Sequence, residues 1–206
     1  PAGLQTSVIS LSNILIQRAI NGFGAVVMAG AAAAGKVDGL VGSTIGAFGL
    51  ATTGFVGQNY GAGRIDRVKR GVRIGLFMAV AASIALGGIL LLLRNQAAAL
   101  FNDDPQVIAS ATQLMSYILP FYFVYAFVEI FAGAMRGAGS TFVPMMVTLV
   151  GMCLLRIVWV WVVPTYFDDV RAVFVVYPVS WVWTGIPMWL LYLKGKWNKK
   201  GLGIKI

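Results

Sequence analysis

Long apolar stretches alternate with short polar connectors along the whole chain. Six stretches each reach the roughly 20 residues that an α-helix needs to cross the hydrocarbon core of a bilayer. Runs such as LGGILLLL do not alternate between polar and apolar positions, which argues against the strands of a membrane β-barrel. The pattern predicts an all-α polytopic membrane protein. Its transmembrane helices are expected at residues 4–22, 25–57, 68–93, 106–135, 142–163 and 170–193, followed by a tail over residues 194–206.

The connectors carry charge that favours one side of the predicted bundle. The connector at residues 55–71, FVGQNYGAGRIDRVKRG, is broken by glycines and rich in basic residues. Cytoplasmic connectors of membrane proteins are enriched in Lys and Arg, so we expect both termini in the cytoplasm. That orientation puts these basic residues on the cytoplasmic side: Arg64, Arg67, Lys69, Arg70, Arg73, Arg136, Lys194, Lys196, Lys199, Lys200 and Lys205.

Composition strengthens this picture and narrows the function. Of the 206 residues, 59% are hydrophobic and only 11% are charged, so the sequence predicts no soluble domain. Topology accounts for the net charge of +9, and we expect no nucleic-acid partner. The chain has no histidine and a single cysteine, Cys153, which argues against a metal site and a His-based catalytic centre. We therefore expect no enzyme, no metal and no cofactor beyond a coupling ion.

Two predicted helices carry a stripe of one kind of residue on one face. The polar stripe of the first helix is spaced by three or four residues: Thr6, Ser10, Asn13, Gln17 and Asn21. It predicts either interhelical hydrogen bonds or a hydrated substrate cleft, since polar groups avoid lipid. The glycine stripe of the second helix has the same spacing: Gly35, Gly39, Gly42, Gly46 and Gly49. It predicts close helix packing or a face along which the helix slides or bends.

Ionisable residues inside the predicted helices are costly and therefore indicate function. They are Arg18, Lys36, Asp38, Glu129 and Arg156. We expect all except Glu129 to form one polar cluster in the outer half of the bundle. Lys36 and Asp38 are two residues apart and point to different sides of their helix. We therefore expect an ion pair of Asp38 with Arg18 or Arg156, unless Asp38 is open to a substrate.

Glu129 is the acidic residue of the fourth helix. With a neighbouring hydroxyl such as that of Tyr125, it predicts a site that exchanges a proton or binds Na⁺. The alternative is a structural acid paired with Arg136, two helical turns away. The substrate- and cation-binding candidates are Asn13, Gln17, Asn21, Lys36, Asp38, Tyr125, Glu129 and Arg156.

Three runs carry a resemblance to a known family. They are VISLSNILIQRAINGFGAVVMAGAAAAGKVDGL, GFVGQNYGAGRIDRVKRG and ILPFYFVYAFVEIFAGAMRGAGSTFVPM. Together they resemble the multidrug and toxic compound extrusion (MATE) family, and more narrowly the C-terminal six-helix half of a bacterial member. The turns VGQNYGAG and MRGAGST are the most specific parts. The chain begins at Pro1, so we expect a fragment or a processed piece of a longer protein.

The resemblance implies a twelve-helix transporter of two six-helix lobes, of which residues 1–206 are one. It implies export of cationic or amphipathic compounds in exchange for H⁺ or Na⁺, with the first two helices lining the central cleft. The implied partners are the missing N-terminal lobe, the substrate and membrane lipid, in a bacterial cytoplasmic membrane. Some Na⁺-linked members have acids on the first and fourth helices of this lobe, whereas this first helix has none.

Other functions fit parts of the sequence. A flippase for lipid-linked oligosaccharides or polysaccharides would use a more cationic cleft, which Arg18, Lys36 and Arg156 would supply. A non-transporting membrane assembly subunit is the third alternative. A membrane-embedded enzyme is disfavoured, because the chain shows no histidine, P-loop or nucleophile motif.

Overall fold

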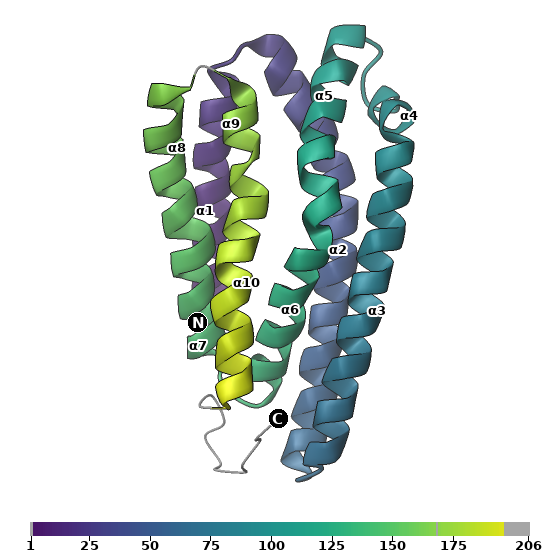
Figure 1. The fold of residues 1–206 in the computed structure, drawn as a ribbon, viewed down its shortest axis with the longest axis vertical. Coiled ribbons are helices and arrows are strands. Elements are labelled where there is room, and N and C mark those ends of the chain that lie inside the picture. The colour runs from purple at the N-terminus through teal and green to yellow at the C-terminus, as the bar shows by residue number, and fades with distance from the viewer. Residues whose placement is uncertain (1, 168, 196–206) are drawn as a thin grey trace.

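All regular structure in residues 2–167 and 169–195, the parts that the computed structural model describes, is helical (Figure 1). The α-helices are α1 (Ala2–Asn21), α2 (Ala25–Gly61), α3 (Ile65–Leu92), α4 (Arg94–Ala99), α5 (Pro105–Ile118), α6 (Tyr122–Gly137), α7 (Phe142–Thr148), α8 (Leu155–Tyr166), α9 (Val170–Phe174) and α10 (Val176–Lys194). A 3₁₀-turn, Leu119–Phe121, joins α5 to α6, and a π-helical segment, Leu149–Leu154, joins α7 to α8.

Five helical segments of the described chain are long and apolar enough to cross a membrane: Ala25–Gly61, Ile65–Leu92, Pro105–Gly137, Phe142–Tyr166 and Val170–Lys194. The prediction of an all-α polytopic membrane protein is therefore confirmed. The first predicted span coincides with α1, which carries the polar stripe and is not one of these five. Its crossing of the membrane stays a prediction.

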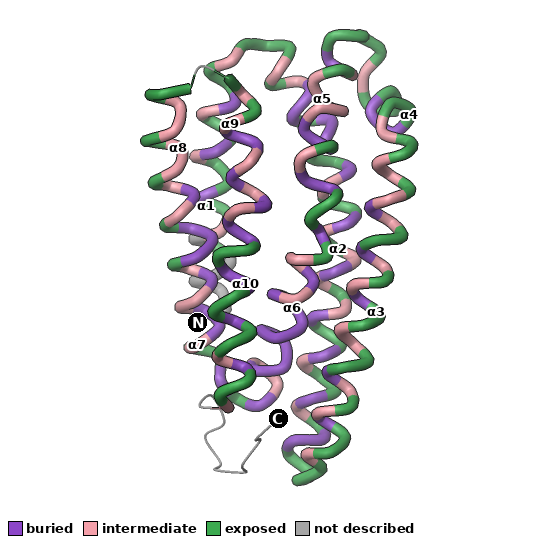
Figure 2. The backbone as a smooth tube through the Cα atoms, in the orientation of Figure 1, coloured by how far each residue is buried: buried purple, intermediate pink, exposed green. Residues whose placement is uncertain are grey.

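The outer surface of the bundle is apolar where lipid would lie. Figure 2 shows exposed residues along the outward faces of the long helices, and on α3 these include Ile74, Phe77, Met78, Ile84 and Ile89. Exposed apolar side chains in such number are unusual for a water-soluble protein, and they are the expected surface of a membrane protein.

The helices pack as two groups that meet in the middle of the bundle. α2, α3, α5 and α6 form one group, and α1, α8, α9 and α10 form the other (Figure 1). α10 packs against α6 and so links the two groups. The side chains of the candidate site come from both groups and project into the space between them.

Glycines let α2 and α6 approach closely. A Cβ atom added at Gly133 would lie 2.5 Å from the carbonyl oxygen of Gly49, and one at Gly137 would lie 2.5 Å from that of Thr53. We call this contact the α2–α6 seam. Of the predicted stripe, Gly42 and Gly49 face α6, whereas Gly35, Gly39 and Gly46 have open space beside them. The packing role of the stripe is thus confined to one part of it.

The α-helical hydrogen-bond pattern is interrupted at two places, each close to a residue that lines the space between the two helix groups. Pro120 cannot donate a backbone hydrogen bond, and it lies in the 3₁₀-turn after which α6 begins at Tyr122. The π-helical segment Leu149–Leu154 has hydrogen bonds that span five residues in place of four, and it ends two residues before Arg156. π-Helical segments in helices are often found at functional sites. Each break therefore precedes a residue that reaches the space between the two helix groups.

The two glycine-rich turns close their helices in the same way. After α2, the N–H of Gly63 bonds to the carbonyl of Tyr60, and the N–H of Arg64 bonds to that of Asn59. After α6, the N–H groups of Gly139 and Ser140 repeat this pattern. Gly63 and Gly139 have φ angles of 71° and 87°, which only glycine adopts without strain. The shared sequence Gly-Ala-Gly is therefore a helix stop.

The α2–α3 connector is shorter than predicted, because both helices continue through its polar residues. α2 ends at Gly61 rather than residue 57, and α3 begins at Ile65 rather than residue 68. The α2–α3 turn, the α6–α7 turn and the end of α10 lie at the same end of the bundle, at the bottom of Figure 1. Lys196, Lys199, Lys200 and Lys205 lie outside the described residues. The cytoplasmic orientation of this end stays a prediction.

Candidate functional site

A polar cavity of about 150 Å³ lies between the two helix groups, and we call it the acidic cavity. α1, α2, α6, the α7–α8 region and α10 all contribute to its wall. Its lining residues are Ile9, Asn13, Asp38, Gly42, Tyr122, Tyr125, Glu129, Thr148, Met152, Arg156, Tyr177 and Trp181. Two carboxylates and one guanidinium therefore share a cavity at the centre of the bundle.

Asp38 reaches the cavity from α2 and is held by α6. The Tyr122 hydroxyl donates a hydrogen bond to the Asp38 carboxylate, and it also lies 3.1 Å from the Asp38 carbonyl oxygen. Gly42 lies one turn along α2, and a Cβ there would be 3.7 Å from the same hydroxyl. The glycine thus leaves room for the tyrosine beside the acid. This contact ties the first half of α2 to the beginning of α6.

Glu129 lies on α6 between a tyrosine and an arginine of its own helix. The Tyr125 hydroxyl donates to one carboxylate oxygen at 3.2 Å, and Arg136 lies 3.4 Å from the other. A Cβ at Gly49 would be 3.0 Å from the carboxylate, so α2 leaves space for this side chain. The Arg136 and Glu129 side chains are 20% and 22% exposed. The pair is thus partly buried.

Arg156 is the buried cation of the cavity, with 4% of its surface exposed. Its Nε donates to the Ser180 hydroxyl and its NH1 group donates to the Asn13 side-chain oxygen, both at 3.0 Å. Its guanidinium carbon lies 4.9 Å from the centre of the Tyr177 ring, which is cation–π distance. Arg156 therefore joins α8 to α1 and α10.

Aromatic rings form one wall of the cavity. Trp181 lies 4.9 Å from Tyr122 and 5.4 Å from Tyr125, measured between ring centres, and Tyr177 lies 6.5 Å from Trp181. Electron-rich rings beside carboxylates attract organic cations, because ring faces and carboxylates both favour positive charge. The wall and the two acids together form a chemically consistent binding surface for a cation.

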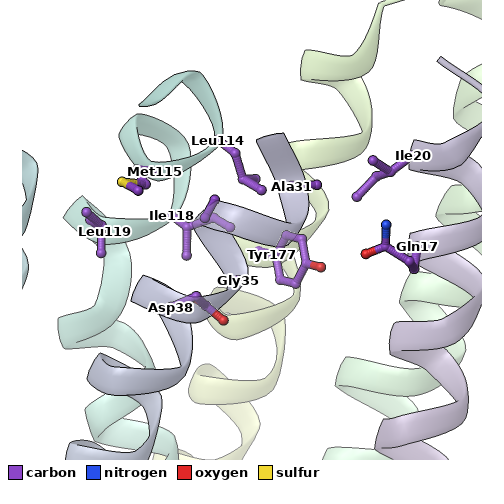
Figure 3. A pocket seen from close by; sticks show the side chains of 11 residues that line it. Gln17, Ile20, Ala31, Gly35, Asp38, Leu114, Met115, Ile118, Leu119 and Tyr177 are labelled. Atoms are coloured by element: carbon purple, nitrogen blue, oxygen red, sulfur yellow. The ribbon is translucent and has the colours of Figure 1, made fainter. Parts of the chain in front are cut away.

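A smaller and mainly apolar cavity of about 90 Å³ adjoins the first (Figure 3). Asp38 and Tyr177 line both cavities, and Gln17 faces Tyr177 across the second one. The remaining lining residues are Ile20, Ala31, Ala34, Gly35, Leu114, Met115, Ile118 and Leu119. The Gln17 amide donates to the Asn21 side-chain oxygen at 2.8 Å, so Asn21 contributes indirectly. Asp38 therefore lies where a polar and an apolar compartment meet.

The structure corrects two sequence predictions. The predicted ion pair of Asp38 with Arg18 or Arg156 is wrong, since Asp38 forms no ion pair within the described residues. Its carboxylate accepts a hydrogen bond from Tyr122, and Arg156 donates to Asn13. The predicted four-residue cluster is also wrong. Arg18 and Lys36 are exposed and line neither cavity, whereas Glu129 joins Asp38 and Arg156 in the acidic cavity.

Sequence reasoning named Tyr125 and Glu129 but missed Tyr122, Tyr177 and Trp181, which line the same cavity. Tyr122, Tyr125 and Glu129 recur at intervals of three and four on α6, and Tyr177 and Trp181 are four apart on α10. This spacing was a signal, but aromatic residues in membrane helices also face lipid. The expected contact between Glu129 and Arg136 is present, at 3.4 Å, and whether Glu129 is a structural acid or a coupling site stays a prediction.

A comparison with protein-family models gives a match to MatE over residues 1–162. The match covers more than half of the chain. The chain belongs to the MatE family. The family resemblance predicted from the glycine-rich turns is thereby confirmed, and assignment to the C-terminal half stays a prediction.

Curated relatives in the MatE family agree with this assignment. The probable multidrug resistance protein NorM of Thermotoga maritima is 28% identical over 96% of this chain and 42% of its own length. The probable multidrug resistance protein YoeA of Bacillus subtilis is 24% identical over 97% of this chain and 43% of its own length. The multidrug resistance protein PmpM of Pseudomonas aeruginosa is 38% identical over 49% of this chain and 21% of its own length. The chain thus spans less than half the length of the relatives that cover nearly all of it.

The two relatives that cover nearly all of this chain are named as probable multidrug resistance proteins. The five membrane-length helical segments of the described chain are those of an integral membrane protein.

Proposed function

We propose that this MatE chain is one lobe of a secondary-active exporter of cationic or amphipathic compounds. The observation that carries the proposal is the acidic cavity, where Asp38 and Glu129 share a wall of tyrosine and tryptophan rings. Export is coupled to the entry of H⁺ or Na⁺. The names of the relatives, which refer to multidrug resistance, support this class of substrate.

Coupling follows from competition for the same negative charges. Glu129 binds the coupling cation with help from the Tyr125 hydroxyl, while Arg136 is the resident counter-charge that the cation replaces. An organic cation in the cavity uses the aromatic wall and the same carboxylates. Binding of one cation therefore weakens binding of the other. Because the lobe is exposed alternately to the two sides of the membrane, this competition results in the exchange of one cation for the other.

The charges of the cavity favour a cationic cargo over an anionic lipid-linked sugar. The flippase alternative relied on Arg18, Lys36 and Arg156 lining one cleft. Two of these residues line neither cavity, and the guanidinium of Arg156 is engaged by Ser180 and Asn13. We therefore retain the exporter as the proposal.

The length of the relatives supports a two-lobe assembly. Because the chain spans 42% and 43% of two relatives that cover nearly all of it, we propose that its partner is the other six-helix half, N-terminal in a full-length protein. The assembly lies in the bacterial cytoplasmic membrane with both termini of this lobe in the cytoplasm, as the basic connectors favour. Membrane lipid is its surrounding partner.

Replacing Glu129 by Gln in the full-length protein tests the coupling site. The change keeps the shape of the side chain and removes its charge, so we expect at least about a tenfold loss of efflux at normal expression. The measurement is ethidium efflux from cells that express wild-type or variant protein, repeated with and without Na⁺ and with and without a proton gradient.

The control is Asp103→Asn, the same chemical change at an exposed residue of the α4–α5 turn. We expect this control to export like the wild type. Normal efflux by Glu129→Gln would overturn the coupling role of Glu129, and equal loss in both variants would overturn the assignment to this cavity.

A further inference from the structure

A polar pocket lies on the outer face of α5 and shares no lining residue with the acidic cavity. It is lined by Val27, Arg94, Ala109, Ser110, Thr112, Gln113 and Ser116. Ala109 and Ser116 are exposed, so the pocket opens to the outside of this bundle. α5 stands between α4 on one side and α9–α10 on the other (Figure 1).

The position of this pocket makes its polarity unusual. Gln113 lies eight residues into the span Pro105–Gly137, which is about 12 Å along the helix. Thr112 and Ser116 satisfy their hydroxyl groups on the backbone of α5 itself. Arg94 lies two residues beyond the end of the span Ile65–Leu92, and one of its terminal nitrogens donates to the carbonyl of Leu91. Its other donors remain available for a ligand, because a guanidinium has five.

An apolar groove of about 620 Å³ continues from this pocket. Ser116 lines both the pocket and the groove. The other groove residues are Tyr117, Phe121, Val175, Pro178, Val179, Val182, Trp183 and Ile186. Along α10 the groove extends from Val175 to Ile186, which is about 16 Å of helix. One leaflet of a hydrocarbon core that is about 30 Å thick has nearly the same depth.

We propose that the polar pocket and the apolar groove together bind one anionic phospholipid. The phosphate lies at Arg94, beside Gln113 and Ser116, and one acyl chain follows the groove between α5 and α10. Three observations carry the assignment: the positive charge at the end of a membrane span, the continuity of polar and apolar surface at Ser116, and the one-leaflet length of the groove. The site lies outside the acidic cavity and does not depend on the exporter proposal.

Native mass spectrometry of the detergent-purified protein tests this site, with phosphatidylglycerol and phosphatidylcholine titrated separately. We expect tighter binding of phosphatidylglycerol to the wild type, by about fivefold, since one basic residue near a membrane surface has about that effect. Arg94→Gln should remove this preference. Val182→Trp fills the groove and should weaken binding of both lipids.

Arg171→Gln is the matched control, because Arg171 is an exposed arginine at the same end of the bundle and lines neither the pocket nor the groove. We expect it to keep the preference for phosphatidylglycerol. Equal effects of Arg94→Gln and Arg171→Gln, or no preference in the wild type, would overturn the site. Unchanged binding in Val182→Trp, with the variant monodisperse, would overturn the acyl-chain groove.

Discussion

Two successive stretches of α6 make opposite kinds of contact, although they share one side of the helix. Along the α2–α6 seam, Gly133 and Gly137 bring the two backbones into close contact. Nearer the beginning of the helix, Tyr122, Tyr125 and Glu129 project polar groups into the acidic cavity. One helix therefore carries a tightly packed stretch and a stretch that lines a cavity.

The difference assigns separate roles to the two stretches. Close backbone contact at the seam leaves little room for the side chains beside it, those of Thr53 and Val56, so the seam holds α2 and α6 as one unit. The cavity is held by hydrogen bonds of Arg156 and the two acids, and such contacts can exchange partners when a cation binds or leaves. We infer that changes at the seam affect folding, whereas changes in the cavity mainly affect transport.

Gly133→Leu is expected to have the largest effect on stability. Even the Cβ atom would lie 2.5 Å from the Gly49 oxygen, so the seam would have to open along its length. We expect a loss of about 3 kcal/mol or more, measured as the unfolding of detergent-purified protein.

Gly39→Leu provides the control. Gly39 belongs to the glycine stripe of α2, but a Cβ atom at this position would have open space around it. It should unfold at nearly the wild-type temperature. If both variants unfold alike, the seam has no special role and the comparison of the two stretches of α6 fails.

The sequence alone was sufficient to predict the all-α membrane fold, but it predicted the α2–α6 seam only in part. Hydropathy located the long helices, because a membrane-spanning helix must be apolar over about 20 residues. The glycine stripe of α2 was visible, yet its spacing alone did not show which glycines meet α6. That choice depends on the glycines of the partner helix, Gly133 and Gly137, and on how the helices cross.

Arg156→Gln is expected to have an intermediate effect. The change removes a buried charge together with its hydrogen bonds to Asn13 and Ser180, and we expect a loss of about 2 kcal/mol. Thermal unfolding in detergent gives the value. A loss no greater than that of Arg136→Gln, whose side chain is partly exposed, would show that the buried contacts of Arg156 do not hold the cavity together.

Tyr122→Phe is expected to have the smallest effect on stability. It removes one hydroxyl from the Asp38 contact and keeps the ring against Trp181, so the expected cost is about 1 kcal/mol. The same unfolding measurement applies. Efflux should fall by more than this small change in stability explains, and a proportional change in both would contradict a role for the hydroxyl in the cavity.

The candidate site was only partly predictable for a physical reason. Asp38, Glu129 and Arg156 stood out because charge is rare in membrane helices. The partners of Glu129, Tyr125 and Arg136, were within reach because they lie on the same helix. The partners of Asp38 and Arg156 lie on other helices, and a carboxylate can be held by a tyrosine as well as by an arginine. Lys36 shows the same limit: its charge suggested the cavity, but α2 turns it outward.

The central claim is that an organic cation and the coupling cation compete for the acidic cavity. Calorimetric titration of tetraphenylphosphonium into the purified full-length protein tests this claim most directly. The account predicts that Na⁺ or acidic pH weakens binding to the wild type by at least about tenfold, and that Glu129→Gln removes this dependence. Binding that is equally tight under all these conditions, in both wild type and variant, would contradict it.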